Sequence, residues 1–242
     1  MNVALDTKNK ILNINSFRYN LEPVYNDRLL KAISDGSVIV DDNCETINER
    51  KELYYCARKV LCKTDCYSQN HYMDIIMYNE EMNTFIESYC NRSLGHKNDI
   101  HENEIHQVVQ GKIGELILWE NRKYWGIFSA GEYVEIPCGA YHCTYILEKN
   151  TIVANIYSNV FWEYNLKLKP YFSVINDISV IKEKDVFYLK NSKFNINIED
   201  RKTLAENGFD DCKSITKKCY YTTQYDLSVS IFDLFAEICK KG

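Results

Sequence analysis

Residues 101–142 read HENEIHQVVQGKIGELILWENRKYWGIFSAGEYVEIPCGAYH and contain two spaced patterns of glycine, acid and histidine. The first runs from Glu104 to Gly111, with six residues between them. The second has the spacing G-x5-P-x-G-x2-H and consists of Gly131, Pro137, Gly139 and His142. Glycine and proline favour turns. The stretch therefore predicts short strands joined by tight turns.

The residues between these turns alternate in the manner of β-strands. From Glu104 to Val109, one face carries Glu104, His106 and Val108, and the other carries Ile105, Gln107 and Val109. Further strands are expected over residues 113–119, 124–128, 133–136, 141–147 and 151–157. We expect the last two strands to form a hairpin around residues 148–150. Such a series of short, closely spaced strands is typical of a barrel.

The two patterns resemble the motifs of the cupin superfamily, which are small antiparallel β-barrels of jelly-roll type. The second motif matches at each position up to His142, but Ile146 stands where the family usually has asparagine. The first motif keeps E-x6-G without a complete H-x-H before it. His96-Lys97-Asn98 comes closest, with asparagine in place of the second histidine. The resemblance covers about residues 80–165.

Within that superfamily, the sequence is similar to the small cupins of bacterial surface-polysaccharide and nucleotide-sugar pathways. Their second motif commonly runs V-x-I-P-x-G-x-x-H, and residues 134–142, VEIPCGAYH, match it. This resemblance implies a small polar, sugar-like or carbonyl substrate.

The composition limits the classes of partner. The chain has 242 residues and a net charge of −5, without a long basic run, so we expect no nucleic-acid partner. No stretch reaches the roughly 20 apolar residues that span a bilayer, and the N-terminus does not resemble a signal peptide. We therefore expect a cytoplasmic protein without membrane contact, with most of its ten cysteines as scattered reduced thiols.

The predicted fold class is mainly β, a cupin-type antiparallel jelly-roll barrel with α/β extensions at both ends. We expect an N-terminal extension over residues 1–79, packed on the barrel, and the barrel itself over residues 80–165. A C-terminal α+β extension is expected over residues 166–242. Residues 225–240, YDLSVSIFDLFAEICK, have apolar side chains at helical spacing and predict a helix near its end.

The resemblance also implies a metal site at the barrel mouth. Carried over by motif, the ligands are Glu104 and His142, with His96 as the early histidine and His101 in the second histidine position. Imidazole and carboxylate together suit a divalent metal ion, namely Fe, Mn, Ni or Zn.

A second ligand set remains open because of strand parity. If residues 101–106 formed one regular strand, His101 would face away from Glu104, whereas a turn between the two residues would remove this objection. The alternative set of Glu104, His106 and His142 needs no turn. Each of these histidines could also be an ordinary hydrogen-bonded residue in a barrel wall.

Three functions are compatible with this pattern. The first is an isomerase or epimerase of a carbonyl compound, with His106 as the catalytic base and Asn155 and Tyr157 as substrate-binding residues, if they face inward. The second is an iron-dependent dioxygenase. The third is a non-catalytic cupin that binds a small ligand. We also expect the protein to form a homodimer.

Overall fold

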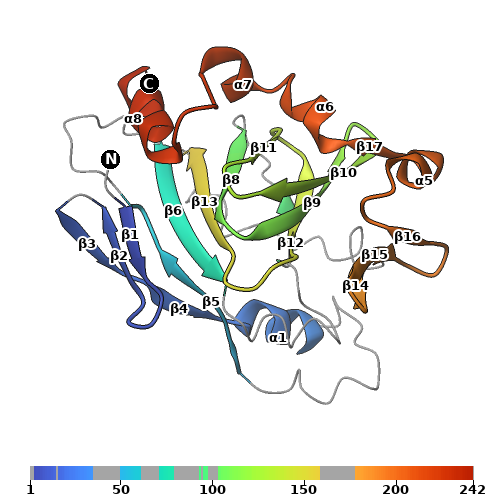
Figure 1. Ribbon diagram of the computed structural model, residues 1–242, viewed down its shortest axis with the longest axis horizontal. Helices are drawn as coiled ribbons and strands as arrows, with labels where there is room; N and C mark the ends of the chain where they lie inside the picture. The colour runs from blue at the N-terminus through green and yellow to red at the C-terminus, as the bar shows by residue number, and fades with distance from the viewer. Residues whose placement is uncertain are drawn as a thin grey trace.

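The structure is a computed structural model that describes residues 3–14, 16–34, 50–60, 71–78, 93, 95–97, 103–158 and 178–241. Its centre consists of eight strands in two antiparallel sheets (Figure 1). These strands are β6 (His71–Tyr78), β7 (His96–Lys97), β8 (Glu104–Gln110), β9 (Lys112–Trp119), β10 (Arg122–Ser129), β11 (Tyr133–Ile136), β12 (Tyr141–Ile146) and β13 (Ile152–Ser158).

The strands pair in a nested order. The outermost pair is β6 with β13, followed inward by β7 with β12, β8 with β11 and β9 with β10. The sheets are completed by the pairing of β13 with β8 and of β12 with β9. A long antiparallel ribbon wrapped in this way is a jelly roll. The predicted antiparallel jelly-roll fold is therefore confirmed.

One predicted connection is wrong. We expected residues 141–147 and 151–157 to form a hairpin, but β12 and β13 lie in different sheets. The chain between them, residues 147–151, crosses from one sheet to the other. The backbone of β12 forms its hydrogen bonds with β9, and that of β13 forms them with β8 and β6. The two strands are therefore paired within separate sheets and not with each other.

The space between the two sheets is largely apolar. The side chains that fill it come from alternate positions of both sheets, as period-two strands require. They include Val108, Ile113, Ile117, Phe128, Val134, Ile136, Ile146 and Val153. Polar side chains on the same inner faces are therefore exceptions that need a chemical explanation.

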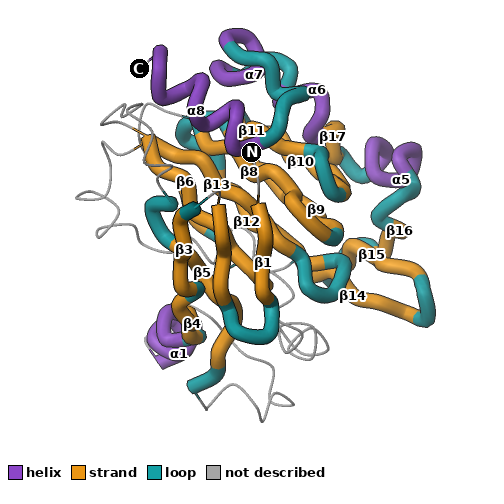
Figure 2. Tube along the Cα trace, turned by 60° about the vertical axis from the view of Figure 1, so that its left-hand side comes forward, coloured by secondary structure: helices purple, strands orange, loops and turns teal. Residues whose placement is uncertain are grey.

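The N-terminal segment extends one sheet and covers its outer face. It contains β1 (Val3–Asp6), β2 (Ile11–Ile14), β3 (Phe17–Asn20), β4 (Glu22–Tyr25), α1 (Asp27–Ser34) and β5 (Glu52–Ala57). β4 and β5 join the sheet of β6, whereas β1–β3 form a separate sheet (Figures 1 and 2). Since β5 and β6 belong to the barrel's sheet, this sheet begins before the expected boundary at residue 80.

The strands and the first helix of the C-terminal segment cover the outer face of the other sheet, and its later helices run across the top of the barrel in Figure 1. Trp125 and Tyr145 pack there in one apolar cluster with residues of the C-terminal strands. The segment contains β14 (Ser179–Glu183), β15 (Val186–Lys190), β16 (Asn195–Asn197), α5 (Arg201–Glu206), β17 (Phe209–Asp211), α6 (Cys212–Thr216), α7 (Tyr220–Gln224) and α8 (Ile231–Lys241). The expected terminal helix is present, but it begins at Ile231 rather than at residue 225.

Helix α8 packs against the outer face of the sheet that contains β6. Its apolar side chains share one cluster with Met73, Ile75 and Met77 of that strand. Within the described ranges, no helix combines the length and apolar character needed to cross a membrane. Among the cysteines in those ranges, Cys56, Cys212 and Cys219 are free thiols.

Candidate metal centre

Three polar side chains meet between the two sheets. Glu104 and His106 project from β8, and His142 projects from β12 of the opposite sheet. The three side chains each offer a ligand atom, and these atoms all lie within 4.8 Å of one another. The exposed fraction of each residue is small: 5% for Glu104, 7% for His106 and 1% for His142. This group corresponds to the second ligand set that the sequence left open.

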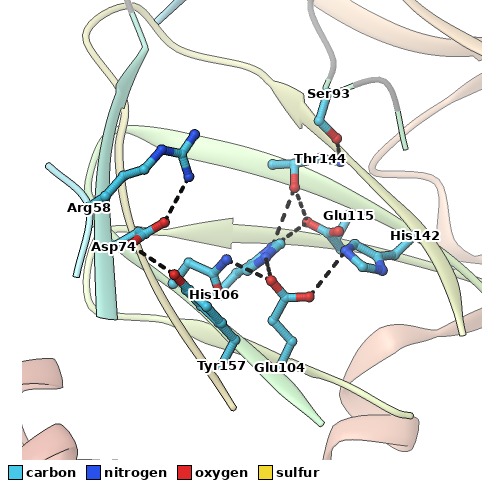
Figure 3. A network of polar contacts seen from close by, with 10 residues as sticks. Arg58, Asp74, Ser93, Glu104, His106, Glu115, His142, Thr144 and Tyr157 are labelled. Carbon is cyan, nitrogen blue, oxygen red and sulfur yellow. Dashed lines mark hydrogen bonds and ion pairs between the residues drawn. The ribbon is translucent and has the colours of Figure 1, made fainter. Parts of the chain in front are cut away.

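The alternation of β8 explains why the first two residues lie together. Glu104 and His106 are two positions apart, so both face the barrel interior, while Ile105 between them packs in the outer cluster with α8. The Glu104 carboxylate lies between the two imidazoles (Figure 3). Its Oε1 is 3.6 Å from His106 Nε2, and its Oε2 is 3.5 Å from His142 Nε2.

A second carboxylate holds the other side of His106. Glu115 on β9 is 0% exposed, and its Oε2 lies 3.5 Å from His106 Nδ1. The Thr144 hydroxyl donates a hydrogen bond of 2.9 Å to the same oxygen and lies 3.4 Å from His106 Nδ1. The two ring nitrogens of His106 therefore face two different carboxylates.

Neighbouring polar residues hold Glu104 and extend the polar region. The Asn155 side chain donates a hydrogen bond of 2.6 Å to Glu104 Oε1. Tyr157, two positions further along β13, donates a hydrogen bond of 3.1 Å to Asp74 of β6. Both residues therefore face the barrel interior, which the sequence had left open. Their predicted role in substrate binding stays a prediction.

Two further histidines, His96 and His101, were predicted as ligands. The backbone of β7 pairs His96 with His142 in register. His101 lies outside the described residues. The roles assigned to these two histidines therefore stay predictions. Of the five residues predicted to bind metal or to act as base, the structure brings together Glu104, His106 and His142.

Glu115, Thr144 and Asp74 were not predicted as site residues from the sequence. A signal was present for Glu115, because it is the one charged residue in the apolar run from Ile113 to Trp119. Its odd-numbered position also gives it the same orientation as Ile113 and Ile117, which lie in the barrel core. A buried carboxyl group of this kind needs hydrogen-bonding or charged partners.

Burial of the His106 imidazole would by itself lower its pKa, but two carboxylates outweigh this effect. Hydrogen bonds and charge interactions with Glu104 and Glu115 raise the pKa of His106 to about 10. In the metal-free chain, the ring is therefore protonated at neutral pH and carries two N–H donors, one toward each carboxylate.

This shift predicts a pH dependence of stability in the metal-free protein. The folded-state pKa of about 10 exceeds the ordinary value of 6.5, so the folded chain holds more protons between these pH values. The stabilisation from His106 is complete below about pH 6.5 and is lost as the pH rises toward 10. Urea unfolding of EDTA-treated protein across this range should show a falling free energy of unfolding.

The matched control is the His106→Gln protein, which cannot gain this proton. The difference in unfolding free energy between the two proteins should shrink with rising pH, because other titrating groups are common to both. Parallel curves from pH 6 to 10 would show that His106 is not held between carboxylates in this way.

No protein-family model matches the sequence, and no curated protein matches it either. Solved structures that resemble part of the fold include a deletion mutant of Bacillus subtilis oxalate decarboxylase. That similarity has a TM-score of 0.36 at 16% identity, over 46% of this chain and 27% of that chain.

Other structures of the same enzyme give similar values. A serine-to-alanine mutant has a TM-score of 0.39 at 13% identity, over 52% of this chain and 30% of that chain. The enzyme at pH 4.6 has a TM-score of 0.37 at 16% identity, over 47% and 27% of the two chains. The matched region is therefore less than a third of the length of those chains. Oxalate decarboxylase from Bacillus subtilis contains Mn(II) centres.

Proposed function

We propose that this protein is a metal-binding enzyme of the cupin type that acts on a small polar, sugar-like or carbonyl compound. The observation that carries this proposal is the convergence of Glu104, His106 and His142, with ligand atoms within 4.8 Å of one another between the sheets. One carboxylate and two imidazoles are a donor set suited to Fe, Mn, Ni or Zn.

The surroundings of His106 support a role as ligand. Its Nε2 faces Glu104 and the other ligand atoms, while its Nδ1 faces Glu115 and Thr144. A metal-binding histidine usually donates its second N–H to a carboxylate or carbonyl, which fixes the ring orientation. Two carboxylates together would also balance the charge of a divalent cation. The buried Glu115 Oε1 accepts no hydrogen bond from any described residue, which leaves an acceptor atom beside this group.

For the reaction, we infer an isomerase or epimerase type, with proton transfer next to a carbonyl group. A bound metal ion would polarise the carbonyl oxygen of the substrate. His106, predicted as the base from the sequence, would take that role in place of a ligand role, with its Nε2 uncoordinated and the metal ion held by Glu104 and His142. A coordinated nitrogen has no lone pair for a proton. Glu104 and Asn155 hold their orientation through the 2.6 Å hydrogen bond between them. Tyr157 lies beside them with its hydroxyl on Asp74.

An iron-dependent dioxygenase is the second candidate, and the same geometry favours it. Two histidines and one carboxylate are the protein ligands of many non-haem iron oxygenases, in which open positions remain for oxygen and substrate. Under this alternative, His106 is a ligand and has no role as a base.

The first experiment is elemental analysis of purified protein together with the His142→Ala and His71→Ala variants. The unchanged protein should hold about one divalent metal ion per chain. The His142→Ala variant should lose it, because one of three ligands is gone. The His71→Ala variant should retain it, because His71 lies against Tyr221, outside the ligand group. Equal metal content in the two variants would contradict the site.

The second experiment separates the reactions. Incubation with candidate carbonyl compounds in deuterated water should incorporate deuterium next to the carbonyl group if the protein is an isomerase or epimerase. Oxygen uptake after anaerobic iron loading, without deuterium incorporation, would favour the dioxygenase. A stable complex with neither reaction would indicate a ligand-binding protein.

A further inference from the structure

A row of polar side chains crosses the inner face of the sheet that contains β8. His106 on β8, Asn155 on β13 and Asp74 on β6 are backbone partners across three adjacent strands. Because paired residues in antiparallel strands lie on the same face, their side chains form one continuous line. The next positions along two of these strands, Val108 and Val153, belong to the apolar barrel core.

Arg58 stands at the far end of this row, just after β5. Its Nη1 donates a hydrogen bond of 3.1 Å to Asp74 Oδ2, and Figure 3 shows Arg58 and Tyr157 in contact with the same carboxylate. Asp74 is only 5% exposed at its side chain and also accepts hydrogen bonds from the Lys59 backbone N–H and the Tyr157 hydroxyl. Three donors thus fix the carboxylate that holds Arg58.

Most of the hydrogen-bonding capacity of Arg58 is not used by this contact. A guanidinium group has five N–H donors, and among the described residues only Asp74 accepts a hydrogen bond from it. Its side chain is 45% exposed, in contrast to the nearly buried carboxylate that it contacts. An oriented, half-exposed arginine of this kind is suited to a second, anionic partner.

We propose that Arg58, oriented by Asp74, binds a phosphate or carboxylate group of the substrate. This assignment rests on the proposed function, since it places the reacting carbonyl end of the same compound at the metal centre. The substrate class is therefore an anionic sugar-like compound rather than a neutral one.

The neighbouring residues fit an anionic ligand with an extended body. The Lys59 ammonium lies 4.7 Å from the centroid of the Tyr72 ring, and this ring lies 5.9 Å from that of Tyr157. A second cation and two aromatic rings therefore accompany Arg58. Asn155 adds a buried Oδ1 that accepts no hydrogen bond from the described residues, an acceptor for a substrate hydroxyl group.

The spacing of the strands sets the size of this compound. Asp74 and His106 lie on strands separated by β13, so their backbones are two strand spacings, or about 10 Å, apart. A six-carbon chain with an anionic group at one end and a carbonyl group at the other is of comparable length.

The experiment measures the affinity for three probes of equal carbon number: glucose, glucose 6-phosphate and glucuronate. Titration calorimetry of the metal-loaded protein should show that at least one anionic probe binds ten- to a hundredfold tighter than glucose, as expected for charge-assisted hydrogen bonds. Preference for the phosphate or for the carboxylate identifies which anion the site takes. The Arg58→Gln variant should lose the preference, and Arg58→Lys should retain part of it because a point charge remains.

Lys217→Gln is the matched control, because it removes an exposed positive charge that follows α6. It should leave the preference unchanged. Equal affinity for all three probes, no binding of either anion, or a preference that survives in Arg58→Gln would each overturn the assignment.

A parallel series separates this result from the metal proposal. In EDTA-treated protein and in His142→Ala, the preference for an anionic probe should persist, because Arg58 and Asp74 do not depend on the metal. Absence of metal together with an Arg58-dependent preference would reject the proposed metal role and retain the anion site. Normal metal content in Arg58→Gln, with the preference lost, is the expected result.

Discussion

Replacing Glu104 with alanine should weaken the binding of a divalent metal ion by more than about 100-fold, because loss of a ligand exceeds the 10- to 100-fold cost of losing an outer contact. Glu104 is the only carboxylate in the group of three ligand residues, and it lies between both histidines. Its removal leaves two imidazoles without a negatively charged ligand. Metal affinity can be measured by competition with a chromophoric chelator.

A graded comparison separates the ligand from the residue that orients it. Asn155→Ala retains the Glu104 carboxylate but removes the side-chain donor to Oε1, so metal affinity should fall by about 10- to 100-fold. Gln110→Ala, at the exposed end of the same strand as Glu104, should leave the affinity unchanged. A Glu104→Ala protein that binds metal as tightly as Gln110→Ala would exclude Glu104 from the site.

The strand pattern made much of this site predictable. Alternation alone placed Glu104 and His106 on one face of β8, and the second motif placed His142 after a turn. Glu115 was not predicted, because its partners come from β8 and β12, which lie on opposite sides of the barrel interior. Local periodicity predicts which side chains share one face of a strand. It does not predict which strands pair or face each other across the barrel interior.

The fact that periodicity does not specify which strands pair also explains why the predicted hairpin was wrong. The nested pairs of the jelly roll join residues far apart in sequence, such as Asp74 and Asn155 in β6 and β13. The predicted hairpin of residues 141–157 followed sequence proximity, which short loops usually favour. The early strands β5 and β6 have no turn or composition signal that assigns them to the barrel. Their membership becomes visible only through the pairing of β6 with β13 and of β5 with β6.

A large loss of folding stability is expected when Glu135 is replaced, because its carboxylate joins the barrel to the C-terminal segment. Glu135 lies on β11 and is 0% exposed. It accepts hydrogen bonds from the backbone N–H groups of Tyr221 and Thr222, at 2.6 and 2.8 Å, and from the Thr222 hydroxyl. Helix α7 has no side-chain cap of its own at Cys219, so Glu135 caps it from the barrel.

The same carboxylate also contacts the start of β8. Asn103, which precedes Glu104, donates a hydrogen bond of 2.7 Å to Glu135 Oε1 and accepts one of 2.9 Å from the Cys138 backbone N–H. Asn103 therefore links Glu135 to the strand of Glu104 and to the turn that precedes His142. Loss of Glu135 should disturb both the C-terminal segment and the positions of Glu104 and His142, two of the proposed metal ligands.

Glu135→Ala should lower the free energy of unfolding by more than about 3 kcal/mol, because each buried donor left without an acceptor costs roughly 1–3 kcal/mol. Urea unfolding measures this loss, and limited proteolysis should show earlier cleavage near Tyr221. Glu132→Ala is the matched control, since Glu132 contacts the same segment through a partly exposed ion pair of 2.8 Å with Lys213. A surface pair of this kind contributes about 1 kcal/mol or less. If the two variants lose similar stability, the buried carboxylate is not the contact that holds the C-terminal segment on the barrel.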